Sequence, residues 1–447
     1  MKNNLLTPTQ HNALCSLGIE ELNAMQLAAL EQCRKLQSMV LLSPTGSGKT
    51  LAYLLPLLER LDDTVKGVQA VVVVPSRELA VQIAGVWRSM NTSFRMVALY
   101  GGRPMNEEVS VLRNSYPSVV VGTPGRLIDH LRSGNLVNDV CRLLVIDEFD
   151  KCLEMGFCDE MQQLLALLPS VDSRFLLSAT NSDKIPDFAG VDAVAPLDFR
   201  VLDELPSDRI TFYKFTTTPD ERLHALFELL CVISDEPVIV FCNFRESVDE
   251  VRSYLAKQGL VVSAYHGALE QKERELALYR FTARCSNILV STDLAARGLD
   301  IDGVRHVVHF QRPMTEDIYV HRNGRTARWD AGGNVYFVSY ENRSLPSFIP
   351  EDIAEFRISK RLTMPEPPEW AALYIGKGKR DKISRGDIAG FFMKKANLHR
   401  EELGSIVVFD RYSYAAVRRC RMRETLRLVA GEKIKGVKTI IEPVRGR

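Results

Sequence analysis

Two successive series of short β-branched runs, separated by helical stretches, constrain the fold of this 447-residue chain more than any other feature. In the first series the apolar runs lie at 71–75, 118–122, 143–147 and 174–180. In the second series they lie at 238–243, 260–267, 287–293 and 306–310. Runs of this length between helical segments are typical of buried parallel strands in α/β proteins. The sequence therefore predicts two tandem parallel-sheet domains.

A third unit follows the segment 364–370, whose three prolines disfavour regular structure. Beyond it the pattern is strand, helix, strand, strand, helix, strand, which is the order of a ferredoxin-like or RRM-type α+β sheet. We therefore expect three domains, at residues 1–200, 206–365 and 371–447. The first two are joined within the proline-containing segment 195–207.

The net charge of +1 conceals a strong asymmetry. Residues 371–447 hold 19 Lys and Arg against 8 Asp and Glu, a charge of +11, which leaves −10 for the residues before them. Such a basic segment is typical of binding to nucleic acid or to an acidic membrane surface, and a solvated run of charge is the alternative.

Several classes of protein are disfavoured by the remaining sequence. No apolar run reaches the length of a membrane span, and the amino terminus lacks the pattern of a secretory signal. The nine cysteines show no C-x-x-C spacing and are expected to be reduced thiols. We therefore expect a cytoplasmic protein without membrane attachment.

The segment SPTGSGKT (43–50) joins an apolar strand to a helix through a glycine-rich turn. Backbone N–H groups around the two glycines can surround phosphate oxygens, and the helix N-terminus adds its positive dipole. Lys49 is expected to reach the β- and γ-phosphates, and Thr50 to bind Mg²⁺. A coincidental glycine turn is the alternative for this segment alone, because Ser43 replaces the first glycine of the general pattern. The ATP contacts predicted here are Ser43, Pro44, Thr45, Gly46, Ser47, Gly48, Lys49 and Thr50.

Two acidic residues, Asp147 and Glu148, end the apolar run at 143–147, where a parallel sheet presents its ligand-binding edge. One carboxylate there can orient Mg²⁺, and the other can position and deprotonate the attacking water. An acidic pair at a strand end is by itself usually a solvated turn. Downstream of a phosphate loop, it indicates ATP hydrolysis.

Eight segments in order resemble the motifs of the DEAD-box RNA helicases: SPTGSGKT, PSRELA (75–80), Gly101–Gly102, TPGR (123–126), DEFD (147–150), SAT (178–180), STDLAARGLD (291–300) and HRNGRTAR (321–328). The resemblance covers residues 1–350. It implies two RecA-like domains, with ATP in the cleft between them and RNA lying across both. It also implies that Asp147 binds Mg²⁺, that Glu148 activates water and that Asp300 contacts the ribose.

Further roles follow from the same resemblance. Asp150 is expected to bridge to Ser178 and Thr180, which couple the nucleotide state to domain closure. Arg325 and Arg328 are expected to act as arginine fingers from the second domain, and fingers contribute about 10³–10⁵ in rate. On the residues alone, the alternative for this basic cluster is a surface ion-pair patch.

This chain departs from the family pattern at several positions. Phe149 stands in place of the alanine in the family name, and Asn323 and Ala327 replace a usual aliphatic residue and a glycine. The adenine-recognition region, GIEELNAMQ (18–26), lacks the usual aromatic residue, proline and threonine. Gln26 is the adenine contact that the resemblance implies, and a glutamine on a helix surface is the alternative.

Strand-to-helix turns of both core domains are expected to hold RNA through phosphates and sugars, without reading sequence. Taken singly, each polar residue in them is also explained as a helix cap or a solvent contact. The predicted contacts are Arg77, Gly102, Arg103, Thr123, Arg126, Asn243, Arg245, Gly267, Gln271, Arg274 and Thr292.

Basic and aromatic residues are interleaved in the third unit, at 376–388 and 411–423. Aromatic rings on an open sheet can stack unpaired bases while Lys and Arg neutralise phosphates. Alternatively, half of the rings are core, since alternate strand residues face inwards. The unit resembles the RNA-binding domain of DbpA-type helicases, which implies a hairpin of 23S-type ribosomal RNA in pre-ribosomal particles as the target. The predicted contacts are Tyr374, Lys377, Lys379, Arg380, Tyr412, Arg418 and Arg419.

The sequence thus predicts a monomeric RNA helicase that uses ATP and Mg²⁺ to unwind or remodel large-subunit ribosomal RNA during ribosome assembly. Two other classes stay open: an ATP-switched RNA clamp that does not hydrolyse, and a DNA translocase with the same core domains. The complete set of catalytic carboxylates and arginines disfavours the clamp. The motifs PSRELA and TPGR, together with the RRM-like third unit, imply RNA and disfavour the translocase.

Overall fold

The computed structural model describes residues 6–43, 47–102, 104–179, 187–191, 194–199, 210–293, 304–326, 332–340, 346–349, 353–358 and 362–444. The chain divides into two compact units, which separate between Leu205 and Pro206. Within the described ranges, no helix has both the length and the apolar character needed to cross a membrane.

The first unit contains a seven-stranded parallel sheet with the strand order β3-β4-β2-β5-β6-β1-β7. Its strands are β1 (Met39–Leu42), β2 (Ala70–Val73), β3 (Met96–Leu99), β4 (Val119–Gly122), β5 (Leu143–Ile146), β6 (Ser173–Ser178) and β7 (Leu197–Asp198). Its helices are α1 (Pro8–Leu17), α2 (Ala24–Lys35), α3 (Lys49–Glu59), α4 (Arg77–Ser89), α5 (Met105–Ser115), α6 (Pro124–Arg132), α7 (Phe149–Glu154) and α8 (Cys158–Ala166).

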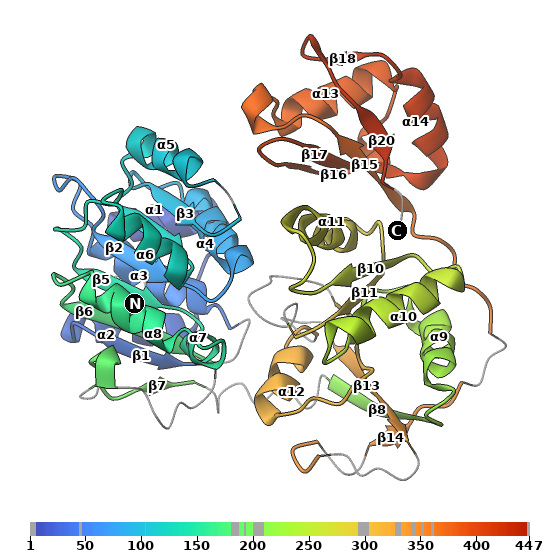
Figure 1. Ribbon diagram of the computed structural model, residues 1–447, viewed down its shortest axis with the longest axis horizontal. Coiled ribbons are helices and arrows are strands. Elements are labelled where there is room, and N and C mark those ends of the chain that lie inside the picture. Colours follow the sequence, from blue (N-terminus) through green and yellow to red (C-terminus); the bar gives the residue numbers. More distant parts are fainter. Residues whose placement is uncertain are drawn as a thin grey trace. The chain divides into compact units, whose positions relative to one another are not determined.

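Helices cover both faces of this sheet (Figure 1). Met39 and Leu41 of β1 pack with α1 to α4, whereas Val40 and Leu42 pack with α5 to α8. Because the strands β1, β2, β4 and β5 are buried on both faces, their sequences are continuous apolar runs rather than alternating ones. Phe149 is buried in the second of these clusters, where its ring contributes to the core.

The second unit begins with another seven-stranded parallel sheet, ordered β10-β11-β9-β12-β13-β8-β14. Its strands are β8 (Ile210–Thr217), β9 (Val238–Phe241), β10 (Val262–Tyr265), β11 (Ile288–Ser291), β12 (His306–His309), β13 (Gly333–Tyr340) and β14 (Ala354–Glu355). Its helices are α9 (Arg222–Ile233), α10 (Arg245–Lys257), α11 (Gln271–Thr282) and α12 (Glu316–Asn323). The predicted tandem parallel sheets are therefore confirmed.

An antiparallel sheet ordered β16-β17-β15-β20 forms the rest of the second unit. Its elements are β15 (Trp370–Ile375), α13 (Arg385–Lys395), β16 (Leu403–Val408), β17 (Ser413–Arg418), α14 (Met422–Leu428) and β20 (Ile441–Pro443). This order confirms the predicted RRM-like α+β fold. A small hairpin of β18 (Lys433–Ile434) and β19 (Val437–Lys438) precedes the last strand.

Candidate functional site

Parallel pairing brings the predicted site residues of the first unit to one edge of its sheet. The phosphate loop follows β1, Asp147 follows β5, and Ser178 ends β6, and these three strands are neighbours. Arg77, Gly102 and Thr123 follow β2, β3 and β4, which are also neighbours. The edge therefore divides into a half that carries the predicted ATP residues and a half that carries the predicted RNA residues.

The described part of the phosphate loop is held by its own side chains. The Lys49 side chain is 9% exposed, and its Nζ donates to the Ser43 carbonyl oxygen at 2.7 Å. The Ser43 hydroxyl donates to the Ser47 hydroxyl at 2.6 Å. Gly48 precedes α3 with φ +91°, in the region that favours glycine, and Thr50 occupies the second position of that helix. Lys49 and Thr50 thus stand at a helix N-terminus, where an anion is favoured.

Helix α2 is tied to the same loop by its first turn. Gln26 is buried, and its side-chain amide donates to the Gly48 carbonyl oxygen at 3.2 Å. The Asn23 amide donates to the Ser47 carbonyl oxygen at 2.9 Å. A Cβ on Gly48 would lie 2.6 Å from the Gln26 amide nitrogen, so glycine permits this close approach. Gln26 therefore lies beside the phosphate loop rather than on an exposed helix surface.

Asp147 and Glu148 are buried at the end of β5. Burial raises the pKa of Asp147, and the positive charge of Lys49 opposes this shift. The Asp147 carboxylate accepts a hydrogen bond from the Glu148 amide at 2.9 Å. Glu148 has φ +50°, a conformation that L side chains rarely adopt and that is common at functional sites. The buried Asp147 carboxylate can therefore bind a cation, and the nearby Lys49 ammonium can bind a phosphate.

The predicted coupling residues are only partly described. Asp150 and Ser178 are both buried, and the Asp150 carboxylate lies 3.7 Å from the Lys151 ammonium. The Ser178 carbonyl oxygen accepts from the Ser43 amide at 3.0 Å, so β6 contacts the start of the phosphate loop directly. Seven predicted residues lie outside the described ranges, and their roles stay predictions: Pro44, Thr45, Gly46, Arg103, Thr180, Asp300 and Arg328.

In the RNA half of the edge, Arg77 packs over the two glycines that follow β3. A Cβ on Gly102 would lie 2.5 Å from a terminal nitrogen of the Arg77 guanidinium, and one on Gly101 would lie 3.4 Å from the other. Glycine at these positions therefore makes room for the arginine. Thr123 is the N-cap residue of α6.

Arg126 is anchored by a buried carboxylate. Its Nε donates to Glu108 Oε2 at 2.7 Å, and His130 Nε2 lies 2.7 Å from the same oxygen. Burial opposes ionisation of Glu108, but hydrogen bonds from His130, Arg126 and the Tyr100 amide outweigh it and lower its pKa. The guanidinium is thus held by an ionised partner within its own domain.

The predicted RNA residues of the second core domain follow β9, β10 and β11, which are neighbours in its sheet. Asn243 is held most firmly. Its Oδ1 accepts from the buried Arg322 guanidinium at 2.7 Å, and its amide N–H donates to Gln311 at 2.6 Å. The same guanidinium pairs with Asp293 at 2.5 Å. Arg322 therefore links the residues that follow β9, β11 and β12.

Helix starts carry most of the other predicted contacts on this edge. Arg245 begins α10 and pairs with the exposed Glu246 at 2.7 Å. Gln271 begins α11, with Arg274 one turn further along. The Gln271 amide donates to Glu275 at 3.1 Å. Gly267 precedes this helix and is exposed, and Thr292 directly follows β11.

Arg325 follows α12 and is 1% exposed, inside the second core domain. One departure from the family pattern lies beside it and has a partner in this chain. The Asn323 carboxamide oxygen lies 2.9 Å from Nε2 of the fully buried His309. Burial, reinforced by the charge of Arg322, lowers the pKa of His309 to about 3. The neutral imidazole therefore donates to the oxygen that an aliphatic residue would lack.

In the third domain, two of the predicted RNA contacts bind the preceding linker. The Arg418 guanidinium lies 4.6 Å from the Trp370 ring centroid and pairs with Glu369. Arg419 donates to the carbonyl oxygens of Pro368 at 2.6 Å and of Trp370 at 3.0 Å.

The other predicted contacts of this domain differ in exposure. Lys377 pairs with Asp381 at 2.9 Å, while Lys379 and Arg380 are exposed. Tyr374 and Tyr412 are half-buried. Their rings lie within reach of Lys272 on α11, at 4.4 and 5.2 Å from its Nζ to their centroids.

Supporting residues were missed by the sequence analysis for two reasons. Glu108 and His130 lie on α5 and α6 and meet Arg126 only through the fold, so no local pattern indicated them. Arg322 lies inside the segment HRNGRTAR, so its basic pattern already contained the signal.

Comparison with known proteins accounts for all three domains. Residues 23–188 match the DEAD/DEAH box helicase family, and residues 221–330 match the helicase conserved C-terminal domain. Residues 372–443 match the DbpA RNA binding domain. The chain is 33% identical to the ATP-dependent RNA helicase DbpA of Escherichia coli K12, over 97% of this chain and 96% of that protein. It is also 33% identical to the DEAD-box ATP-dependent RNA helicase CshA of Bacillus subtilis, over 71% of this chain and 64% of that protein.

Two solved structures share the architecture of the core domains. The first is S. cerevisiae Dbp5 bound to RNA and ADP BeF3, with a TM-score of 0.68 and 25% identity. The similarity extends over 75% of this chain and 88% of the Dbp5 chain. The second is the DEAD-box helicase Mss116 bound to ssRNA and UDP-BeF, with a TM-score of 0.67 and 26% identity over 76% and 74% of the two chains.

The His309 and Asn323 pair gives a testable prediction. Asn323→Leu, which restores an aliphatic residue, leaves the buried His309 N–H without its acceptor and is expected to cost about 1–3 kcal/mol of local stability. Faster amide hydrogen exchange in β12 and β13 measures this cost.

The double variant Asn323→Leu/His309→Phe serves as the control. It removes both polar partners and keeps an aromatic ring to stack on Phe337, whose centroid lies 4.6 Å from that of His309. Exchange should return towards the wild-type rate, because replacing both partners by apolar groups is nearly neutral. Exchange as fast as in Asn323→Leu alone would contradict the pairing.

Proposed function

The chain belongs to the DEAD-box family of ATP-dependent RNA helicases, and we propose that it unwinds or remodels large-subunit ribosomal RNA during ribosome assembly. We further propose that it works as a monomer in the cytoplasm. The observation that carries the enzymatic part is the placement of Lys49, Asp147 and Glu148 on one sheet edge, next to the half that carries the RNA motifs.

The donor set of the first unit fits Mg²⁺. Asp147 supplies a buried carboxylate and Thr50 a hydroxyl, and hard cations prefer such oxygen ligands. Among the described residues, no group of three or more His, Cys, Asp or Glu side chains is arranged to hold a metal. Asp147 and Thr50 would therefore hold Mg²⁺ together with phosphate and water oxygens. When bound, Mg²⁺ neutralises the charge that develops on the phosphates.

The residues of this chain are assigned the remaining steps. Lys49 holds the β- and γ-phosphates by its ammonium, and Gln26 orients the adenine. Glu148 positions the attacking water and takes its proton on a carboxylate oxygen. Arg325 approaches the γ-phosphate only when RNA is bound by both core domains, so hydrolysis depends on RNA.

Selection of the RNA is assigned to the third domain, because the core contacts are to phosphate and sugar and carry no sequence information. The similarity to the DbpA RNA binding domain supports 23S-type ribosomal RNA in pre-ribosomal particles as the target. Exposed lysines are better placed for its phosphates than Arg418 and Arg419, which bind the linker.

The β18 and β19 hairpin contains the strongest candidates. Lys433 and Lys438 are exposed and directly opposite each other, and like charges in that position repel. Neither side chain has an ion-pair partner in the part of the chain that the structure describes. A bound phosphate would relieve this repulsion.

The catalytic assignment is tested by Glu148→Gln, which keeps a polar side chain and removes the base. ATP turnover with saturating RNA should fall by about 10²–10⁴-fold. The dissociation constants for ATP and RNA should stay close to those of the wild type. The exposed Glu31→Gln on α2 is the matched control and should turn over ATP normally. Near-normal turnover by Glu148→Gln would remove Glu148 from this role.

The RNA assignment is tested by Lys433→Gln/Lys438→Gln. Maximal turnover should be unchanged, but more ribosomal RNA should be needed to reach half of it. The dependence of log affinity on log salt should flatten by about 0.7–0.9 for each RNA phosphate that the variant no longer neutralises. An unrelated single-stranded oligonucleotide should show a much smaller change.

The matched control, Lys66→Gln/Lys257→Gln, removes the same charge from exposed positions on the core domains. It should leave the preference for ribosomal RNA intact. If the hairpin variant and this control need the same concentration of each RNA for half-maximal turnover, the hairpin does not select the target.

A further inference from the structure

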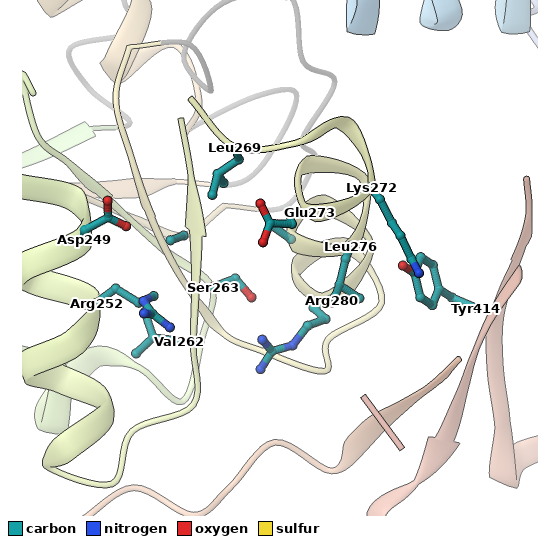
Figure 2. Close-up of a pocket in the computed structure, with 12 residues that line it drawn as sticks. Asp249, Arg252, Val262, Ser263, Leu269, Lys272, Glu273, Leu276, Arg280 and Tyr414 are labelled. Carbon is teal, nitrogen blue, oxygen red and sulfur yellow. The ribbon is translucent and has the colours of Figure 1, made fainter. Parts of the chain in front are cut away.

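A cavity of about 510 Å³ lies beside β10, the edge strand of the second core sheet (Figure 2). Residues of α10, α11 and β17 complete its lining. A cavity of this volume is large enough for a small organic molecule. The residues that line it include none of the described side chains assigned above to ATP or RNA. The cavity is therefore a separate site, for which neither role provides a ligand.

Two guanidinium groups line this cavity. Arg252 belongs to α10 and Arg280 to α11, and Figure 2 shows the Arg280 side chain extending from its helix towards Ser263. Burial lowers the pKa of Arg280, and the positive charges of Arg419 and Arg252 lower it further. In the described part of the chain, the Arg280 side chain has no hydrogen bond or ion pair. A bound anion would offset both the burial and the repulsion.

Two buried hydroxyl groups belong to the same lining. Ser263 of β10 is 2% exposed, and Tyr414 of β17 is 1% exposed. Neither hydroxyl has a hydrogen-bond partner among the described residues. A hydroxyl that is buried without a partner is costly, so a ligand that accepts a hydrogen bond from it gains affinity.

The two carboxylates of the lining stand at its exposed rim and have contacts of their own. Asp249 is exposed, and its Oδ1 lies 3.4 Å from His266 Nε2. Glu273 is exposed and accepts a hydrogen bond from the Glu270 amide at 3.1 Å. Neither carboxylate pairs with the cavity arginine on α11. At the rim they can accept hydrogen bonds from the hydroxyl groups of an organic ligand.

The rest of the lining is apolar, with side chains from β10, α11 and the segment before α11. Apolar walls with a few convergent polar groups are usual in sites for small organic molecules. Guanidinium groups favour phosphate, because their planar fork donates two parallel hydrogen bonds to its oxygens. A phosphate also has enough acceptor oxygens for a neighbouring hydroxyl. The apolar lining residues are Val262, Ala264, Leu269, Leu276 and Ala277.

We propose that this cavity binds a small organic phosphate, whose phosphate group lies between Arg252 and Arg280 and accepts a hydrogen bond from Ser263. The organic part lies on the apolar wall, and its hydroxyl groups face the carboxylates at the rim. The phosphate belongs to a free small molecule rather than to the RNA chain, because the described side chains assigned to RNA do not line the cavity.

Calorimetric titration of the full-length chain with ribose 5-phosphate tests this site. Every protein in the test carries Lys49→Gln, which weakens binding of phosphate at the phosphate loop. Ribose 5-phosphate should bind with one equivalent, and free ribose should not bind. Adding Arg280→Gln should weaken binding by about 10–100-fold, and adding Ser263→Ala by about 3–10-fold.

Lys257→Gln is the matched control, because it removes one positive charge from an exposed position on α10, away from the cavity lining. It should leave the affinity for ribose 5-phosphate unchanged. Absence of binding by the parent protein, or equal binding by the Arg280→Gln protein, would overturn the proposal.

Hydrogen exchange locates the ligand and distinguishes the two sources of phosphate. Ribose 5-phosphate should slow amide exchange in β10 and α11 of the parent protein but not of the Arg280→Gln protein. Slower exchange at the start of α3 alone would place the ligand at the phosphate loop and contradict the proposal. A saturating single-stranded oligonucleotide should leave the affinity for ribose 5-phosphate unchanged. Loss of that affinity would show that an RNA phosphate occupies the cavity instead.

Discussion

Parallel strand pairing is the constraint on which the functional groups of both core domains depend. In the first sheet, the register that pairs Leu42 with Ser178 sets the phosphate loop beside the end of β6. The neighbouring pairing of β5 with β6 brings Asp147 to the same edge. Charged groups are thus gathered at the end of an apolar sheet, where they are partly withdrawn from water.

This arrangement has an energetic consequence for ligand binding. The raised pKa of Asp147 means that its ionised form is disfavoured by burial, even though Lys49 is positively charged nearby. A Mg²⁺ ion bound with ATP would stabilise the ionised Asp147 carboxylate. It would thereby offset the free-energy cost of burying that charge. Glu148, with its left-handed backbone, adds conformational strain at the same place.

The strands and motifs were predictable because their signals are local. Both faces of the sheets are covered, so the central strands appear as continuous apolar runs, and the phosphate loop and acidic pair follow such runs directly. The partners of Arg126 were not predictable, since Glu108 and His130 reach it through tertiary contacts. Such contacts leave no short-range pattern.

The third domain illustrates the same limit. Alternation along β15 and β17 was compatible with aromatic residues in the core or on the surface, because both faces of that sheet carry apolar side chains. The structure places the aromatic residues of these two strands on the face away from α13, against α11. Only the position of α11 shows that this face packs on a helix, and no sequence pattern reports that position.

Steady-state ATP turnover, measured with total ribosomal RNA, with duplex DNA and without nucleic acid, tests the central claim most directly. The predicted ATP-binding residues lie on the first core domain and Arg325 lies on the second. Such an enzyme should hydrolyse ATP rapidly only when RNA is bound by both domains. Equal rates under all three conditions, or stimulation by duplex DNA alone, would contradict an RNA-dependent helicase. Binding of ATP and RNA without turnover would instead indicate an RNA clamp.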